Sequence, residues 1–235
     1  MAPHLIRSAI AKIYGVQLNY WTVFIFVASF EGMGRRSDHS REELREIAVG
    51  AGHRHMDEVG FAHFSAREVA KRIGYSIGTI YNVFGSYDAF ILAINGRTLA
   101  LWRDHLVRRL EKVEQDRLRA AIAAYFEFAT AHRHAWAAIY DFRLPEDAAP
   151  PERYQDEVRA IFDIVVAEVH AALAPSRKGD AEALTRSLLA SVHGHCVFAM
   201  NGTFAMLGEK APAEAAWDRV QEAVSAMTPG QRNQR

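Results

Sequence analysis

Cysteine and long hydrophobic runs are both scarce in this chain of 235 residues. The one cysteine, Cys196, excludes an intrachain disulfide, which fits a reducing cytoplasm. The apolar run at residues 21–30 is far shorter than the roughly 20 residues that a membrane span needs, so we expect no membrane partner. The net charge is +0, so the basic balance usual for a nucleic-acid-binding protein is missing. Nucleic acid is not excluded, because only the surface that meets phosphate must be positive.

Catalytic motifs are also missing. The sequence contains no serine elbow, Walker loop, dinucleotide fingerprint or metalloprotease motif, so we expect no catalytic residue and no cofactor. Histidines form three close pairs, but residues two apart on a helix point in different directions and chelate a metal poorly. We therefore expect no metal site, and an enzyme that uses these histidines is the third hypothesis. The pairs are His53/His55, His132/His134 and His193/His195.

Half of the residues are hydrophobic, and they recur at helical spacing along most of the chain, which predicts an all-α fold with a sizeable core. Ser40 and Glu43 form a capping box that opens a first helix, which we expect to fray or end within residues 53–59. We expect Asp180 to cap a helix over residues 181–202, and Pro212 to begin a last helix.

The stretch from residue 64 to residue 84 predicts two short helices joined by a tight turn. Ser65 and Glu68 complete a capping box at the start of the first helix. Gly74 suits a helix end that needs a positive φ, and Ser76 can cap the second helix. Spacing alone fits both a generic helical hairpin and a DNA-binding helix-turn-helix. The inner face of the second helix is Ile80, Val83 and Phe84.

The residues from 69 to 90 closely resemble the DNA-binding signature of the TetR family of transcriptional regulators. This resemblance implies an N-terminal three-helix helix-turn-helix domain followed by a larger helical ligand-binding and dimerisation bundle. It also implies three partners: double-stranded operator DNA, a small-molecule effector and a second copy of the chain. The resemblance is specific over about residues 40–95 and looser beyond. The matching residues are Ala70, Gly74, Ser76, Gly78, Thr79, Ile80, Tyr81, Phe84 and Ser86.

The resemblance places the outer face of the second short helix near DNA. Asn82 could read adenine, Thr79 could meet a thymine methyl group or a phosphate, and Tyr81 could donate to a phosphate. The alternative is that Thr79 and Tyr81 only pack or cap. The predicted DNA-binding residues are Arg35, Arg36, Ser65, Arg67, Ser76, Ile77, Gly78, Thr79, Tyr81, Asn82 and Tyr87.

Two residues depart from the family pattern. Val83 stands where the family often has His or Tyr, and Tyr87 stands where it often has Lys. No Lys or Arg lies between Gly74 and Asn95, so phosphate affinity must come from helix N-termini and from other basic residues. The runner-up function is therefore a TetR-like interaction or sensor protein with a degenerate DNA reader. The basic residues available are Arg67, Lys71, Arg72 and the arm Arg35-Arg36.

Aromatic residues of the second half predict an apolar effector pocket within the bundle, although such residues are also plain core. His193-Gly194 resembles the His-Gly element of a TetR subgroup named for a Trp-His-Gly signature, but the expected tryptophan does not precede it. His193 is either a ligand contact or a satisfied core group. Cys196 is interpreted as a buried apolar residue, with redox sensing as the alternative. The predicted ligand-binding residues are Trp102, Tyr125, Phe126, Trp136, Tyr140, Phe162 and His193.

The predicted organisation has four parts. Residues 1–32 are a non-native or disordered extension, because Met33-Gly-Arg-Arg-Ser resembles a natural start. Residues 33–86 form the helix-turn-helix domain, residues 87–228 form the bundle, and residues 229–235 are a polar tail. The helices at 181–202 and 212–227 are the expected dimer seam. The whole predicts a cytoplasmic, ligand-responsive regulator that acts as a repressor.

Overall fold

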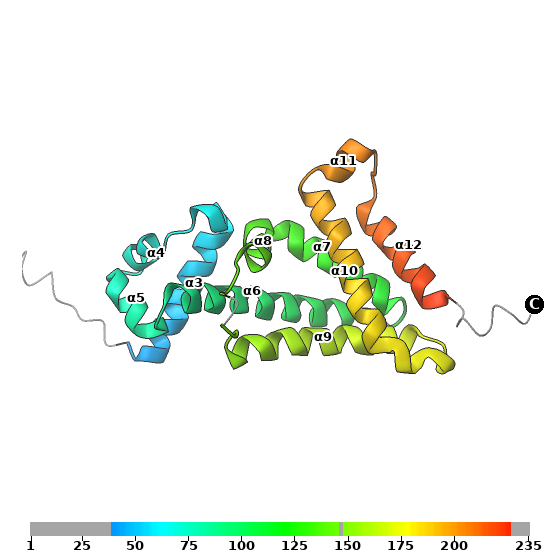
Figure 1. Cartoon of the computed structure of the whole chain (residues 1–235), viewed down its shortest axis with the longest axis horizontal. Coiled ribbons are helices and arrows are strands. Elements are labelled where there is room, and N and C mark those ends of the chain that lie inside the picture. Colours follow the sequence, from blue (N-terminus) through cyan, green and yellow to red (C-terminus); the bar gives the residue numbers. More distant parts are fainter. Residues whose placement is uncertain (1–38, 146–147, 227–235) are drawn as a thin grey trace, which may run out of the picture. The chain divides into compact units, whose positions relative to one another are not determined.

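The computed structural model describes residues 39–145 and 148–226, and helices are labelled as in Figure 1. The predicted arm residues Arg35 and Arg36, and the predicted start at Met33, lie outside the described residues. Within the described residues the chain is helical and has no strand, which confirms the all-α prediction. The first elements are α3 (Arg41–Val59), η1 (Phe61–His63), α4 (Ala66–Arg72), α5 (Ile77–Phe84) and α6 (Tyr87–Leu110). They are followed by α7 (Arg117–Ala131), α8 (Arg133–Asp141), α9 (Glu152–Ala172), η2 (Pro175–Asp180), α10 (Ala181–Met200), α11 (Thr203–Leu207) and α12 (Pro212–Ser225).

Local capping sets the starts of three consecutive helices. The Ser65 Oγ accepts from the Glu68 N–H at 3.3 Å and begins α4. Ser76 and Ser86 begin α5 and α6 in the same way, with N···O distances of 3.2 and 3.0 Å. Only half of the predicted capping box at Ser65 forms, because the Ser65 N–H donates to the His55 ring at 3.4 Å. The predicted helix pair is therefore fixed by side-chain hydrogen bonds at its boundaries.

Helix α3 ends at the last residue of the range in which fraying or an end was expected, and it does not fray after residue 53. It continues to Val59, and His53 and His55 are buried in it with Met56. Burial against neighbouring helices replaces the regular apolar spacing that the sequence lacks here. Gly52 allows α6 to approach closely, since a Cβ atom there would lie 2.5 Å from the Ile94 Cδ1.

Helix α6 contributes to two hydrophobic cores. Its first half supplies Phe90, Ile91 and Ile94 to a core shared with α3, α4 and α5. Its second half supplies Trp102 and Leu106 to a larger core with α7, α9, α10 and α12. In Figure 1, α6 is the long green helix that runs from the short helices α4 and α5 into the bundle. One continuous helix therefore joins the two cores.

The ends of the bundle helices were predicted less well. Helix α12 begins at Pro212 as expected. The prediction for Asp180 is wrong, because this residue ends η2 in a helical conformation and makes no capping hydrogen bond. Its carboxylate instead lies 3.5 Å from the Arg177 guanidinium. The short helix α11 was not predicted.

Asp57 connects the end of α3 to the start of α8. Its carboxylate accepts from the Ala135 N–H at 3.4 Å and lies 3.1 Å from the His132 Nδ1. Its backbone carbonyl accepts from the His134 Nδ1 at 2.9 Å. The residue before α8, His132, makes no side-chain cap of its own. The first turn of α8 is therefore capped by a residue of another helix.

Across residues 39–145 and 148–226, no single helix is long and apolar enough to span a membrane. The one combination with suitable length and composition is α5 followed by α6, and the chain bends by 76° between them.

Candidate functional site

The outward face of α5 consists of small and uncharged groups. Gly78, Tyr81 and Asn82 are exposed, and 43% of the Tyr81 side-chain surface is accessible. Ile77 and Thr79 are half-buried, and the Thr79 hydroxyl lies 3.0 Å from the Ser76 Oγ. Thr79 is thus partly engaged at the helix cap, whereas Tyr81 does not pack into the core. This face has the size and chemistry to enter a major groove.

Two basic side chains of α4, the helix that precedes α5, are exposed to solvent. Arg67 and Lys71 are exposed, and neither forms an ion pair among the described residues. Arg72 differs, because its guanidinium lies 2.7 Å from the Glu58 carboxylate and 3.6 Å from that of Glu68. The hydrogen bond between them raises the pKa of Arg72 and lowers that of Glu58. Arg67 and Lys71 are therefore the more available groups for phosphate.

The two departures from the family pattern have structural roles. Val83 is buried in the core that α3, α4 and α5 share with the first half of α6. Tyr87 is half-buried, and its ring centroid lies 6.4 Å from that of Phe64. Burial, with the nearby Asp88 charge, raises the pKa of Tyr87, so its hydroxyl remains a hydrogen-bond donor at neutral pH. Ser65 is also half-buried, and its hydroxyl is occupied by the cap of α4.

Arg41 supports the recognition helix α5, a role that the sequence analysis did not predict. Its guanidinium donates to the carbonyl oxygens of Asn82 and Val83, both at 3.2 Å. These carbonyls belong to the last turn of α5, which has no following residues to satisfy them. The positive charge also interacts favourably with the negative C-terminal end of the helix dipole. Arg41 therefore holds the C-terminal end of α5, while Ser76 holds its N-terminal end.

A network of aromatic rings occupies the core of the bundle. Trp102, Tyr125 and Trp136 are all buried, and their ring centroids lie between 5.2 and 6.0 Å apart. The Tyr125 hydroxyl lies 2.8 Å from the His193 Nδ1, and the Tyr140 ring stacks on His193 at 4.1 Å. Phe126 packs against the same core, 6.4 Å from Tyr125. Six of the seven predicted ligand-binding residues thus gather in one region.

The pKa values of the polar groups in this region are shifted in the direction that favours their neutral forms. Burial raises the pKa of Tyr125, with a further contribution from Tyr140. Partial desolvation also raises the pKa of Tyr140, which is 39% exposed. Burial lowers the pKa of His193. The neutral imidazole can therefore accept the Tyr125 O–H. An interaction with the Trp136 indole N–H acts in the opposite direction on the Tyr125 hydroxyl and lowers its pKa.

A cavity of about 60 Å³ adjoins these rings. Trp102 and Tyr125 line it, but Phe126, Trp136, Tyr140 and His193 do not. Its volume is much smaller than the roughly 300 Å³ at which ligand pockets usually begin. The other lining residues are apolar and include Ile161, Val165, Leu188 and Val192.

Phe162 lies apart from the other six predicted ligand-binding residues. The next residue on a helix is turned by about 100°, so Phe162 faces away from the cavity that Ile161 lines. It borders a surface groove with Val158 and Val166, and Arg186 lies over its ring at 5.6 Å. Phe162 therefore does not lie in the region that holds the other six residues, and its role in ligand binding stays a prediction.

The remaining candidates of the second half are separated in space. His193 contacts Tyr125, whereas the His195 Nδ1 donates to the Ser191 carbonyl at 2.8 Å. Among the described residues no group of three or more His, Cys, Asp or Glu side chains could hold a metal ion. Cys196 is 1% exposed, and burial raises the pKa of its thiol to about 11. That thiol is protonated at neutral pH, which disfavours redox sensing.

Two family models match the chain. The model described as bacterial regulatory proteins of the tetR family matches residues 48–94, which include α4 and α5. The model described as a tetracyclin repressor-like C-terminal domain matches residues 118–224. Together they cover about two thirds of the chain. No curated protein matches the sequence.

Solved structures share the fold at low sequence identity. A protein of unknown function from Rhodococcus sp. RHA1 is 23% identical, with a TM-score of 0.65 over 82% of this chain and 100% of that chain. A TetR-like transcriptional regulator from Rhodococcus sp. RHA1 is 18% identical, with a TM-score of 0.51 over 83% and 100%. The multidrug binding protein EbrR, solved with imidazole, is 17% identical, with a TM-score of 0.55 over 82% and 99%.

We call the helices α3, α4 and α5 the reader. One family model matches most of the reader, including its capped helix pair, and the other matches the bundle. The chain belongs to the TetR family of transcriptional regulators and carries its helix-turn-helix DNA-binding domain.

Proposed function

We propose that the chain is a repressor that binds operator DNA as a homodimer in the cytoplasm and is released by a small apolar molecule. The observation that carries this proposal is the exposed, uncharged face of α5 beside the unpaired Arg67 and Lys71. Uncharged side chains read base edges, while the flanking cations bind phosphate and set the position on the duplex. Asn82 is the principal candidate for base reading, and Tyr81 for a phosphate contact.

The effector site that we propose lies at the aromatic network. The cavity next to Trp102 and Tyr125 is apolar, and Trp136 packs on both of these rings. An apolar molecule suits that lining. Because the cavity holds only about 60 Å³, such a ligand must displace helices as it binds. Trp102 belongs to α6, so the displacement would reach the reader through that helix.

The dimer seam that we propose is the outer face of α10 together with α12. A Cβ atom at Gly194 would meet no atom within 4 Å, so this glycine faces open space in the single chain. Ala190 is exposed on the same face, and Phe198 is 44% exposed. Small residues permit close approach of a second α10, and an exposed aromatic ring gains from burial there.

The test is binding of the full chain to DNA from upstream of its own gene, measured across a salt series. We expect selective binding that weakens steeply as salt rises. Arg67→Glu and Lys71→Glu should each lower the affinity for DNA about tenfold or more. Each should also reduce by roughly one the number of counterions released on binding, which is obtained from the slope of affinity against salt concentration. Arg108→Glu is the matched control, because Arg108 is exposed on α6 and outside the reader. Arg72→Glu is a poor probe, since it would also break the contact with Glu58.

Two outcomes would contradict the proposal. Absence of selective binding at low salt would favour the interaction or sensor protein with a degenerate reader. Equal losses in Arg67→Glu and Arg108→Glu would show that α4 does not meet the phosphates. With the operator in hand, release of the protein by apolar molecules should be abolished or weakened by Tyr125→Phe, while binding to DNA remains intact.

A further inference from the structure

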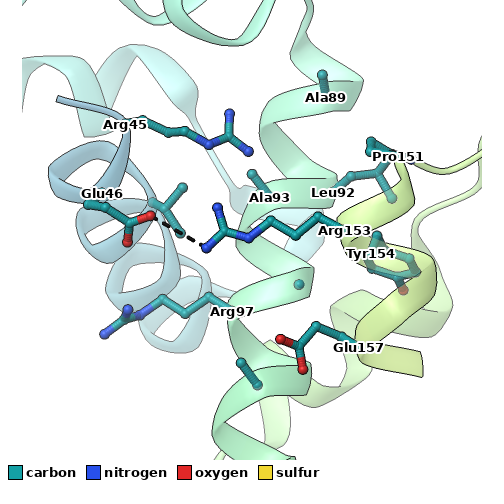
Figure 2. Close-up of a pocket in the computed structure, with 13 residues that line it drawn as sticks. Arg45, Glu46, Ala89, Leu92, Ala93, Arg97, Pro151, Arg153, Tyr154 and Glu157 are labelled. Carbon is teal, nitrogen blue, oxygen red and sulfur yellow. Dashed lines mark ion pairs between the residues drawn. The ribbon is translucent and has the colours of Figure 1, made fainter. Parts of the chain in front are cut away.

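A second cavity, of about 140 Å³, lies where α3, α6 and the first turn of α9 meet, and Figure 2 shows the residues around it. It shares no lining residue with the cavity at the aromatic network. Its floor is apolar and includes Val49 and Leu92. Small residues on one side of α6 leave the space open, because they recur every three or four positions where larger side chains would fill it. These are Ala89, Ala93, Gly96 and Ala100.

Each of the three helices contributes one arginine to this cavity. Arg45 comes from α3, Arg97 from α6 and Arg153 from α9 (Figure 2). Arg153 extends toward Glu46, but the two charged groups remain 3.8 Å apart and exposed. Arg97 has no ion-pair or hydrogen-bond partner among the described residues. Arg45 lies over the Phe84 ring at 4.9 Å and also lacks a carboxylate partner among those residues.

The acidic groups of the cavity do not balance these charges. Glu157 is the second carboxylate that lines it, and Arg103 already binds this group at 2.6 Å. Glu46 is left as the sole incompletely paired carboxylate beside three guanidinium groups within the described lining. An anion in the cavity would give these guanidinium groups a charge partner that the described residues supply incompletely. Guanidinium groups match a carboxylate in particular, because their planar donors can bind both of its oxygens.

We propose that this cavity binds a small organic carboxylate with an apolar body, at a site separate from the effector site in the bundle. The carboxylate would pair with Arg97 and Arg153, and the apolar body would lie on Leu92, Ala93 and the Tyr154 ring. A cavity of about 150 Å³ holds a benzene-sized molecule, so the ligand has roughly six to ten non-hydrogen atoms.

The position of the cavity gives its ligand a regulatory consequence. Helix α3 belongs to the reader core, and α9 packs in the bundle core. A carboxylate held by Arg97 and Arg153 would contact α6 and α9 beside α3 and would favour one arrangement of these helices. If operator DNA prefers the same or the opposite arrangement, DNA and carboxylate must change each other's affinity by the same factor.

The probe is benzoate, titrated into the full chain by isothermal calorimetry. We expect one benzoate per chain. Arg97→Gln and Arg153→Gln should each weaken binding roughly ten- to a hundredfold, because each removes a charge-assisted hydrogen bond. Arg108→Gln, on the same helix as Arg97 but outside the cavity, should bind benzoate as the unmodified chain does. Circular dichroism of each variant establishes that it is folded.

Ala93→Met tests the apolar part of the site, because the longer side chain fills the cavity and leaves the three arginines in place. It should abolish benzoate binding. Inorganic phosphate serves as the second probe and should bind much more weakly than benzoate. No benzoate binding by the unmodified chain at millimolar concentration would overturn the proposal, as would binding that is unchanged in Arg97→Gln and Arg153→Gln. Phosphate binding as tight as that of benzoate would overturn the assignment of an apolar body.

Discussion

The reader and the bundle are built from similar helices, but their helix ends are fixed in different ways. In the reader, Ser65, Ser76 and Ser86 each cap a helix through a side-chain hydrogen bond. In the bundle, α7, α8, α9, α10 and α12 all begin without a side-chain cap from the preceding residue. The reader is therefore specified locally, whereas the bundle depends on burial of apolar faces.

The largest expected effect is on the bundle core. Trp102→Ala removes a buried ring that packs on Tyr125 and Trp136, and should lower the free energy of unfolding by about 3–5 kcal/mol. Urea denaturation of the unmodified chain and the variant measures this difference. Leu207→Ala is the control, because Leu207 is 70% exposed and should change stability by less than about 0.5 kcal/mol. A loss below 1 kcal/mol for Trp102→Ala would mean that burial does not dominate the bundle.

The second largest effect concerns His53 of α3, at the boundary between the reader and the bundle. His53 is buried, and burial lowers its pKa from 6.5 to about 4. Protonation therefore favours the unfolded chain, and stability falls as the pH decreases from about 7 toward 4. The contribution of His53 to this fall should be about 2 kcal/mol between pH 7 and pH 5. His53→Leu should flatten the pH dependence of unfolding by that amount, and an unchanged slope would contradict this prediction.

Removing a reader cap should have a smaller effect. Ser76→Ala leaves the Thr79 N–H without its partner at the start of α5 and should cost about 1 kcal/mol. Operator binding should weaken more than stability suggests, because the affected turn carries Gly78 and Thr79. Fluorescence anisotropy with labelled operator measures the affinity. Ser76→Thr can keep the hydroxyl and should restore most of the binding.

The smallest effect is expected at the corresponding position in the bundle. Asp180 precedes α10 but makes no cap, and its carboxylate is 58% exposed and lies 3.5 Å from Arg177. Asp180→Ala should therefore change the free energy of unfolding by only a few tenths of a kcal/mol. A loss equal to that of Ser76→Ala would remove the proposed distinction between local capping in the reader and burial in the bundle.

Local sequence signals predicted the reader well, and they failed where the structure depends on distant contacts. The serines at 65, 76 and 86 act on groups three residues away, so their roles can be read from spacing. Arg41 acts on α5 across 41 residues of sequence, and no spacing rule could identify it. The position within residues 53–59 at which α3 ends could not be predicted for the same reason, because the burial of His53 and His55 depends on distant helices.

The candidate effector site was predictable in composition but not in arrangement. Aromatic content indicated a cluster around Trp102 and Tyr125, and the structure contains one. Which residues line the cavity depends on helix rotation, and a turn of one residue separates Phe162 from Ile161. The second cavity arises from small residues of α6 opposite two other helices. A sequence pattern shows such small residues but not the space between them.

Asp57 limits how freely this reader could be exchanged among related regulators. The first turn of α8 receives its cap from α3, through a contact that joins residues 78 positions apart. A chimaera with a foreign reader would leave the Ala135 N–H and His132 without their partner unless the donor also carries an acidic residue at that site. A reader and a bundle are therefore compatible only when the reader carries an acidic residue at position 57 for the start of α8.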